Sequence, residues 1–438
     1  MAGFDIRELM NDIEEAPGKV WFWDLEQAVI DADRCVQCGV CVAACPTDSI
    51  GIGDDDLPKL VRMCTGCSLC WDFCPRGGLR HEATWKLGSA RQCEDNSSSA
   101  EPDLKLSSAP QETDDEEIRI EPDFKITGNG AGRSIEGLGR VHESFTARVD
   151  PMIEGAQDGG VVSALLISLL EAGEIDGALV ARESATEPWK GEAFLATTPE
   201  EVRECAGSFY NQTLALGHVD FKGYDLPPNP RVAVVGTPCE IEGIKAMQAR
   251  PWTWGSSRVE AITLTIALLC TKSFNYEKLM LEEVRNKRGV DLDNVGRVDV
   301  IRGKLIVEAR GGETIFEEPI RDFHGAALKG CDECADFMGH AADISVGSVG
   351  SADGYSSVLI RTEEGLAAWS HVREKLSTRS LDKPEALDKL DALDKRVAFK
   401  SLKRAFDPEA PLFIDYEEHL NNYSGTDRAP VEHEAVRY

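Results

Sequence analysis

A duplicated cysteine motif near the N-terminus constrains this chain more than any other feature of its sequence. The pattern C-x2-C-x2-C-x3-C-P occurs twice with an offset of 29 residues, at Cys35, Cys38, Cys41, Cys45 and Pro46 and again at Cys64, Cys67, Cys70, Cys74 and Pro75. Eight cysteines in one register indicate an internal duplication. Three thiolates spaced two residues apart can wrap one iron–sulfur cubane in a tight loop.

The fourth cysteine of each motif predicts a crossed pairing of ligands, because in two-cluster ferredoxins it binds the cluster of the other motif. We therefore expect one 4Fe-4S cluster on Cys35, Cys38, Cys41 and Cys74, and a second on Cys64, Cys67, Cys70 and Cys45. Zinc is the alternative, but zinc sites favour paired C-x2-C knuckles over this run. Residues 31–80 resemble bacterial-type ferredoxins, so this segment is predicted to conduct single electrons while the bound chemistry lies elsewhere.

Composition indicates a globular protein of a reducing compartment. The 438 residues are enough for two or three domains, and their net charge of −30 disfavours nucleic acid as a partner. The longest apolar runs, 161–170 and 262–270, fall short of the roughly 20 residues that cross a bilayer. The N-terminus lacks the pattern of a secretory signal. We expect a cytoplasmic protein whose 14 cysteines serve metal rather than disulfides, with peripheral docking on a membrane complex left open.

The predicted fold class is multidomain, α+β followed by α/β. We expect a small ferredoxin-like two-cluster domain (1–90), an acidic flexible linker (91–125), an α/β flavin-binding domain with a mixed sheet (126–400) and a C-terminal tail (401–438). In the α/β domain, apolar patterns predict strands over 176–181, 231–235, 262–269 and 356–361, two hairpins over 298–320, a buried helix over 161–170, and helices over 363–376 and, exposed, over 381–395.

The second half of the chain contains four further cysteines that are candidate metal ligands, and two of them lie at predicted strand ends. Cys239 begins a helix after the 231–235 strand, where the helix dipole is expected to lower its pKa. Cys270 ends the next strand on the edge where open α/β sheets bind ligands. Together with the C-x2-C pair Cys331 and Cys334, these thiols suffice for a third cluster. Each alone also fits a small buried residue. Cys93 and Cys205 have no partner by spacing, so we interpret them as structural or incidental.

Two glycine-rich segments allow different interpretations. Gly159 and Gly160 precede the 161–170 helix, where close backbone approach and free N–H groups suit an anionic ligand. An ordinary turn with Asp158 as the helix N-cap is the equal alternative. The 128–132 segment, with glycine at every second position, follows the linker rather than a strand, so we interpret it as a loop and not a dinucleotide fingerprint.

Six motifs in one order resemble the beta-subunit family of coenzyme F420 hydrogenases and dehydrogenases. They span residues 155–181 (GAQDGGVVSALLISLLEAGEIDGALVA), 235–240 (VGTPCE), 268–276 (LLCTKSFNY), 331–337 (CDECADF), 342–351 (ADISVGSVGS) and 358–365 (VLIRTEEG). The resemblance covers about residues 135–400 and, with the ferredoxin segment, is strongest to the input subunit of dehydrogenases that oxidise reduced F420. The long acidic linker departs from the compact members of the family.

The resemblance implies FAD, and a 4Fe-4S cluster in the same domain. It assigns the flavin to Gly159, Gly160, Ser163, Gly236, Thr237, Pro238, Lys272, Asp343, Ser345 and Gly347, and the cluster to Cys239, Cys270, Cys331 and Cys334. Because hydride passes between stacked rings, no catalytic triad or acid–base residue is expected. The acidic tail of the coenzyme calls for local cations, and the candidates are Lys190, Lys272, Arg302 and Lys304.

The expected activity is an oxidoreductase that moves electrons between reduced coenzyme F420 and 4Fe-4S clusters through FAD. The clusters would pass single electrons to a partner protein subunit or complex. One alternative keeps FAD and the clusters but changes the substrate, as in a chlorophyll-type reductase or a formate dehydrogenase beta subunit. Another alternative is a polyferredoxin electron carrier without a substrate site. The presence of bound flavin distinguishes the two flavoprotein hypotheses from this carrier.

Overall fold

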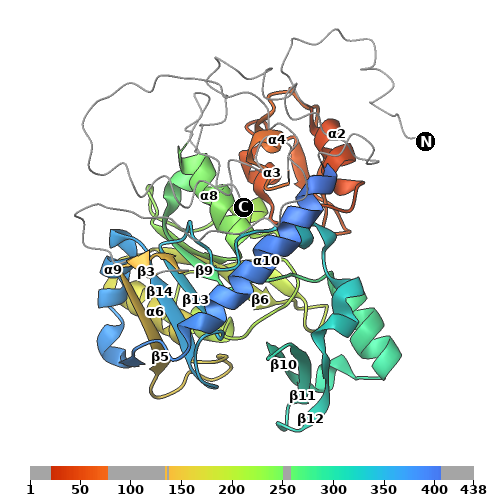
Figure 1. The fold of residues 1–438 in the computed structure, drawn as a ribbon. Helices are drawn as coiled ribbons and strands as arrows, with labels where there is room; N and C mark the ends of the chain where they lie inside the picture. The colour runs from red at the N-terminus through yellow and green to blue at the C-terminus, as the bar shows by residue number, and fades with distance from the viewer. Residues whose placement is uncertain (1–20, 77–133, 136–137, 250–257, 406–438) are drawn as a thin grey trace, which may run out of the picture.

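The N-terminal module repeats its backbone as the sequence repeats its cysteines. The computed structural model describes residues 21–76, 134–135, 138–249 and 258–405 (Figure 1). The predicted linker 91–125, the 128–132 segment, Cys93 and most of the predicted tail lie outside these ranges. The first module contains α2 (Phe22–Leu25), a π-helical turn (Glu26–Ile30), α3 (Val40–Ala44), β1 (Ile50–Ile52), β2 (Pro58–Leu60) and α4 (Leu69–Phe73).

The duplication extends to backbone conformation. Helices α3 and α4 are equal in length and lie 29 residues apart, and antiparallel β1 and β2 stand between them. Gly39 and Ser68, one before each helix, both have a left-handed φ, of +77° and +64°. Gln37 and Gly66 match in the same way, with φ of +52° and +63°. Left-handed positions are unfavourable for residues other than glycine, so the two tight cysteine loops impose them.

The larger domain contains the predicted mixed sheet. Its eight strands run in the order β15-β5-β14-β13-β9-β8-β6-β7, and β13, β9, β8 and β6 are mutually parallel. The strands are β5 (Glu143–Val149), β6 (Gly177–Glu183), β7 (Gly191–Ala196), β8 (Val232–Gly236), β9 (Ile262–Leu268), β13 (Ile344–Gly347), β14 (Ser356–Ile360) and β15 (Leu376–Arg379). The parallel centre aligns the carboxyl ends of β8 and β9, which places the segments of Cys239 and Cys270 at one edge.

Helices cover both faces of the sheet. On one face, α6 (Val161–Ala172) and α9 (Glu363–Ser370) bury apolar side chains such as Leu165 and Trp369. On the other, α8 (Pro238–Ala249) buries Ile241 and Ile244. A short helix, α7 (Pro199–Glu204), follows β7. Alternate residues of the central strands enter the two cores, as the period of two in a strand requires.

The N-terminal module shares the second of these cores. Val36, Val40 and Phe73 are buried in the same apolar cluster as Ile241 and Ile244 of α8. Contact between α3 and α8 is close, because a Cβ added to Gly243 would lie 2.3 Å from Cγ2 of Val40. The ferredoxin-like module is therefore an integral layer of the molecule and lies beside α8 in Figure 1.

A third, smaller unit projects from the sheet (Figure 1). It combines the antiparallel strands β10 (Val295–Ile301), β11 (Lys304–Ala309) and β12 (Thr314–Pro319) with a π-helix (Glu277–Lys287) around its own apolar core. This confirms the two hairpins predicted over 298–320. A two-stranded ribbon, β3 (Ser134–Ile135) and β4 (Gly139–Arg140), precedes β5.

Two predictions for the C-terminal part need correction. The predicted 363–376 helix ends at Ser370, and residues from Leu376 instead join the sheet as β15. The helix predicted over 381–395 is α10 (Pro384–Ala405), and it is not simply exposed. Leu387 is fully buried, and the helix packs against the 329–333 turn that carries Cys331. Across the described ranges, the structure contains no helix long and apolar enough to span a membrane.

Candidate iron–sulfur and flavin sites

The first four predicted thiols converge as the crossed pairing requires. Burial raises the pKa of the Cys35 thiol to about 12, and the nearby Cys74 thiol adds to the rise. Cys41 is affected, after burial, by Cys35, Cys38 and Cys74. The backbone N–H of Gln37 donates to Cys35 Sγ at 3.4 Å, and that of Arg76 donates to Cys74 Sγ at 3.4 Å. We call these thiols the first set: Cys35, Cys38, Cys41 and Cys74.

The second set lines a cavity. Cys45 joins Cys64, Cys67 and Cys70 around a small pocket, with Ile50 among the other walls. The cavity thus unites one thiol of the first motif with three of the second. After burial, Cys67, Cys64 and Cys45 are the groups that raise the pKa of Cys70 most. The backbone N–H of Ser49 donates to Cys45 Sγ at 3.2 Å.

Each set offers four thiols, which are the donors that a 4Fe-4S cluster requires. Tetrahedral zinc, with Zn–S near 2.3 Å, draws its sulfurs to about 3.8 Å from one another, whereas a cubane binds each thiolate through a different iron. Among the described residues, no group of three His, Cys, Asp or Glu side chains could hold one metal ion. The chemistry of the donors thus fits clusters, and their assignment to each set stays a prediction.

The third set comes from three places in the α/β domain. Cys239 opens α8 after β8, Cys270 follows β9, and Cys331 and Cys334 lie in the turn under α10. Cys331 and Cys334 raise the pKa of Cys270, second only to burial. Ser273 links two of the segments, because its N–H donates to Cys331 Sγ at 3.5 Å and its carbonyl accepts from Leu328 N at 2.9 Å.

The expected low pKa of Cys239 is wrong for the protein without metal. The thiol is buried, with Cys38, Glu240 and Cys334 close by, and its pKa lies well above the ordinary value. Loss of hydration outweighs the helix dipole, which contributes only near a helix end. Thr237 Oγ1 lies 3.1 Å from Cys239 Sγ, and Gln212 Nε2 donates to the same sulfur at 3.5 Å.

Two buried arginines of the N-terminal module reach the loop of the third set. Arg34 forms a bidentate pair with Glu333, at 2.7 and 2.8 Å. Arg76 donates from Nε to the carbonyl of Gly330 at 2.6 Å. Gly330 is required here, because a Cβ on it would lie 1.9 Å from the carbonyl oxygen of Arg34. These contacts fix the spacing between the two modules.

The three sets influence one another electrostatically. Cys74 of the first set affects Cys70 of the second, and Cys38 of the first affects Cys239 of the third. Within the second set, Cys67, Cys64 and Cys45 affect Cys70 more than Cys74 does. The cross-set effects nevertheless indicate that thiols of the first set lie near thiols of each of the other two sets.

The predicted flavin residues at the start of α6 are held mostly by contacts within the protein. A Cβ on Gly159 would lie 2.2 Å from Ala147 O, and its N–H donates to Ser356 Oγ at 3.0 Å. Gly160, with φ of +64°, is the N-cap of α6, so Asp158 is not. Ser163 is half-buried in the first turn of α6.

The residues around Gly236 form a second tight turn. Gly236 ends β8, and Pro238 is the first residue of α8. Glu240 folds back so that Thr237 N donates to its Oε2 at 2.8 Å. A Cβ on Gly236 would lie 2.7 Å from that oxygen. Packing inside the protein thus accounts for glycine at this position, whatever binds at the edge.

The remaining predicted flavin residues lie deeper. Asp343 is 2% exposed and accepts hydrogen bonds from Lys245, Thr265 and Thr362. Ser345 is fully buried and donates to Gly339 O at 3.1 Å. Gly347 packs against Leu269, and Lys272 is paired with Asp332. Assignment of these side chains to FAD stays a prediction. Leu268, which sequence reasoning missed, is 39% exposed at the end of β9.

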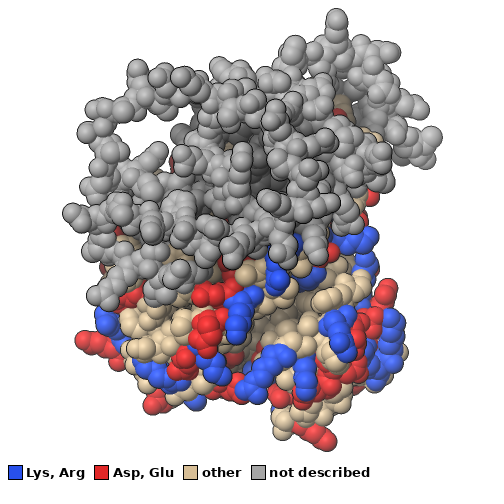
Figure 2. Space-filling view, viewed as in Figure 1, with Lys and Arg blue, Asp and Glu red and all other residues tan. Residues whose placement is uncertain are grey.

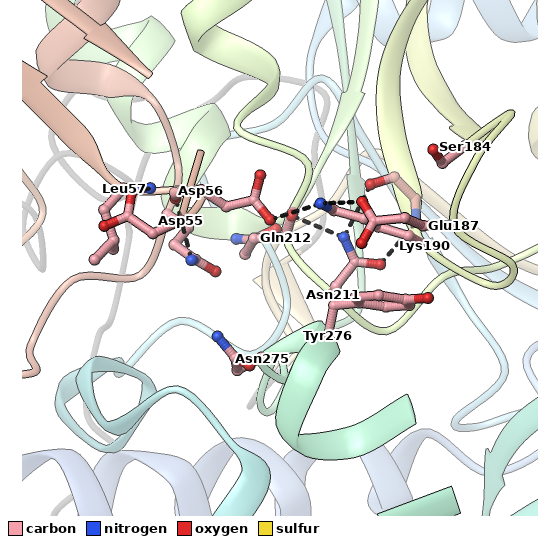
Figure 3. A network of polar contacts seen from close by, with 12 residues as sticks. Asp55, Asp56, Leu57, Ser184, Glu187, Lys190, Asn211, Gln212, Asn275 and Tyr276 are labelled. Atoms are coloured by element: carbon pink, nitrogen blue, oxygen red, sulfur yellow. Dashed lines mark hydrogen bonds and ion pairs between the residues drawn. The ribbon is translucent and has the colours of Figure 1, made fainter. Parts of the chain in front are cut away.

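The cations nominated for the coenzyme tail are each paired within the protein. Lys190 binds Asp56 at 3.0 Å and Glu187 at 2.7 Å, and thereby joins the β1–β2 turn to the α/β domain (Figure 3). Arg302 pairs with Asp353, and Lys304 with Glu317, both on the exposed surface. In Figure 2, basic and acidic side chains lie side by side on the visible face rather than in separate patches.

Arg76 is the residue at the site that sequence reasoning most clearly missed. A signal for it exists in the repeat, because Pro46-Thr47 corresponds to Pro75-Arg76 across the 29-residue offset. The two motifs share every cysteine but differ at this position, where the first has a small neutral residue and the second has a cation. Arg34 and Glu333 carried no such signal, since they are 299 residues apart in sequence.

The fold and thiol sets define an iron–sulfur protein in which a two-cluster ferredoxin domain is built onto an α/β domain. Residues 28–80 match the 4Fe-4S dicluster domain. Residues 144–219 and 229–384 match the N-terminal and C-terminal parts of the coenzyme F420 hydrogenase/dehydrogenase beta subunit. The chain belongs to this beta-subunit family, whose members are subunits of oxidoreductases.

Relatives differ in how much of their length the chain spans. It is 31% identical over 357 residues to a coenzyme F420-dependent sulfite reductase of Methanocaldococcus jannaschii, covering 78% of this chain but 46% of that protein. It is 33% identical to the coenzyme F420 hydrogenase subunit beta of Methanococcus voltae, covering 56% of this chain and 86% of that protein. A solved chain of the F420-reducing [NiFe] hydrogenase complex from Methanosarcina barkeri has 27% identity and a TM-score of 0.58, covering 63% of this chain and 98% of that one.

Proposed function

We propose that this protein is an oxidoreductase that moves electrons between coenzyme F420 and a partner protein through bound FAD and three 4Fe-4S clusters. The observation that carries the proposal is that Cys239 of the third set is buried in the same core as Cys38 of the first set. A polyferredoxin alone would not need a cysteine set built from the ends of β8 and β9. That set lies at the sheet edge where open α/β domains bind their ligands.

The flavin is the part that connects two kinds of chemistry. When bound, FAD accepts a hydride as an electron pair and releases electrons singly. The chain supplies a place for it rather than a nucleophile. The first turn of α6 presents backbone N–H groups to an anion, and the half-exposed Leu268 offers an apolar surface beside Cys270. Several predicted flavin residues already pack against other protein groups, so we propose that they support this edge and do not contact the flavin directly.

We infer the kind of partner from the relatives of this chain. Relatives named as subunits of hydrogenase and dehydrogenase complexes favour an electron-accepting protein subunit. The chain spans about half the length of the sulfite reductase it matches. A cytoplasmic location fits these proposals.

Anaerobic purification followed by iron, sulfide and flavin analysis tests the proposal. We expect about twelve iron atoms and one FAD per chain, and reduction of a viologen by reduced F420. Iron and sulfide without FAD would overturn the flavin and leave an electron carrier. FAD without activity toward reduced F420 would overturn the substrate.

A pair of cysteine variants isolates the third cluster. Cys239→Ala should lower iron by about four atoms per chain while the N-terminal clusters remain. Cys205→Ala is the matched control, because this half-buried thiol lies outside the three sets. Unchanged iron in Cys239→Ala would exclude Cys239 as a ligand.

A further inference from the structure

Arg76 occupies the junction between two thiol sets. It stands two residues after Cys74 of the first set, and its Nε donates at 2.6 Å to the carbonyl of Gly330, the residue before Cys331 of the third. Its Nη1 donates to Pro75 O at 2.8 Å. The side chain is 3% exposed. The guanidinium therefore binds one backbone carbonyl next to Cys74 of the first set and one next to Cys331 of the third set.

A buried cation on neutral carbonyls requires a negative neighbour. Removing a guanidinium from water is costly unless opposite charge compensates it. The carbonyl that Arg76 binds belongs to Gly330, next to Cys331, and Glu333 of the same turn is paired with Arg34. The thiolates that a cluster on the third set requires would supply negative charge beside Arg76.

The repeat shows that the folding of a cysteine loop does not require this cation. Thr47, the equivalent of Arg76 in the first motif, lines the cavity of the second set, and its Oγ1 lies 3.6 Å from Cys45 Sγ. A short neutral side chain thus suffices after one C-x3-C-P segment. The charge at the other segment faces the α/β domain, where the third set lies.

We propose that Arg76 is a positioning residue that tunes the relay by stabilising the reduced form of the third cluster. The inference rests on the proposed function, because it assumes that the third set holds a 4Fe-4S cluster. Reduction adds one electron to that cluster and breaks no bond. A fixed cation nearby favours the form with the extra negative charge, so it raises the reduction potential.

The geometry predicts an unequal effect over the three clusters. The guanidinium of Arg76 binds the carbonyl of Gly330, next to Cys331 of the third set, at 2.6 Å, whereas only its backbone N–H donates to Cys74 Sγ of the first set. At the second set, Thr47 occupies the equivalent position. Loss of the charge should therefore lower the potential of the third cluster more than those of the other two.

Arg76→Thr, which copies the first motif, tests the proposal together with Arg76→Lys. Each full-length protein is purified anaerobically, and its clusters are titrated with mediators and followed by electron paramagnetic resonance. In Arg76→Thr we expect the equilibrium constant for reduction of the third cluster to fall at least tenfold, about 59 mV for one electron. Arg76→Lys should retain most of the wild-type value. Lys329→Ala, which removes a solvent-exposed cation of the same turn, is the control and should shift none.

The outcomes separate this inference from the function on which it rests. Wild-type protein with about eight iron atoms would refute the third cluster itself. Wild-type protein with about twelve and equal third-cluster potentials in all variants would refute only the role of Arg76. Equal shifts of all three clusters would also refute it, because they indicate general loosening. If Arg76→Thr loses the third cluster, retention in Arg76→Lys supports the role of charge, and loss from both variants overturns it.

Discussion

At the scale of single residues, burial determines the chemistry of the thiols. The cysteines of all three sets for which a pKa shift is resolved have a pKa raised first by loss of hydration. Thiolates are nevertheless the ligands of iron–sulfur clusters. Cluster binding must therefore remove protons from buried thiols, so assembly should become easier as pH rises.

Crossed ligation gives a sharp prediction for double variants. Cys45→Ser should lose about four iron atoms per chain, because Cys45 lies with Cys64, Cys67 and Cys70. Adding Cys64→Ser should remove no further iron, whereas adding Cys35→Ser should remove about four more. Iron and sulfide assays of the purified variants provide the measurement. The opposite pattern would mean that each motif binds its own cluster.

Asp158 predicts a pH dependence of stability. Burial, with a smaller effect of Asp299, raises the pKa of its carboxyl to about 6. The unfolded chain then loses this proton before the folded one, so the free energy of unfolding falls as pH rises from about 4 to 6. Asp158→Asn should remove about 2 kcal/mol of that fall, less than full linkage because the side chain is partly exposed. Urea midpoints at pH 4.5 and 7 measure it, and parallel curves for both proteins would contradict it.

At the scale of elements, the contact between the N-terminal module and the Cys331 turn depends on a buried ion pair. Arg34 and Glu333 have side chains only 7% and 9% exposed. Arg34→Met should destabilise the protein by about 3–5 kcal/mol, because it leaves a buried carboxylate without this partner. Adding Glu333→Met should restore much of the loss. Thermal midpoints of wild type, Arg34→Met, Glu333→Met and the double variant measure the coupling, and additive losses would show that the pair is not coupled.

Close backbone contact gives a second prediction at this scale. Gly330→Ala places a methyl group against the carbonyl of Arg34, so the turn must shift away from the N-terminal module. We expect a loss of about 1–3 kcal/mol. Gly325→Ala is the matched control, because a Cβ there meets nothing within 4 Å. Similar thermal midpoints for the two variants would show that the turn tolerates the shift.

At the scale of the whole molecule, the shared core makes the two modules one cooperative unit. Val40 and Cys38 are buried together with Ile241 and Cys239. Separate unfolding of the ferredoxin-like module would expose apolar surface of α8 as well as its own. Heating should therefore bleach the visible absorbance of the clusters and abolish the far-ultraviolet helical signal in a single transition. Two separated transitions would show that the modules unfold independently.

The sequence by itself determined the dicluster cysteine motif and most elements. The duplicated cysteines and the strands that end near Cys239 and Cys270 follow from spacings within a few residues or from strand periodicity. The crossed pairing of the ligands stays a prediction from the same spacing. Such signals are local, so they survive without knowledge of the fold. The same local reasoning failed at Leu376, whose place in β15 depends on pairing with Val149.

Only the tertiary structure decided how the parts meet. The pairing of Arg34 with Glu333, the burial of Arg76 and the raised pKa of Cys239 depend on which surfaces pack together. Long-range contacts of this kind are set by shape, burial and the balance of charge over the whole core. Sequence spacing carries no record of them, because one fold brings together residues that are hundreds of positions apart.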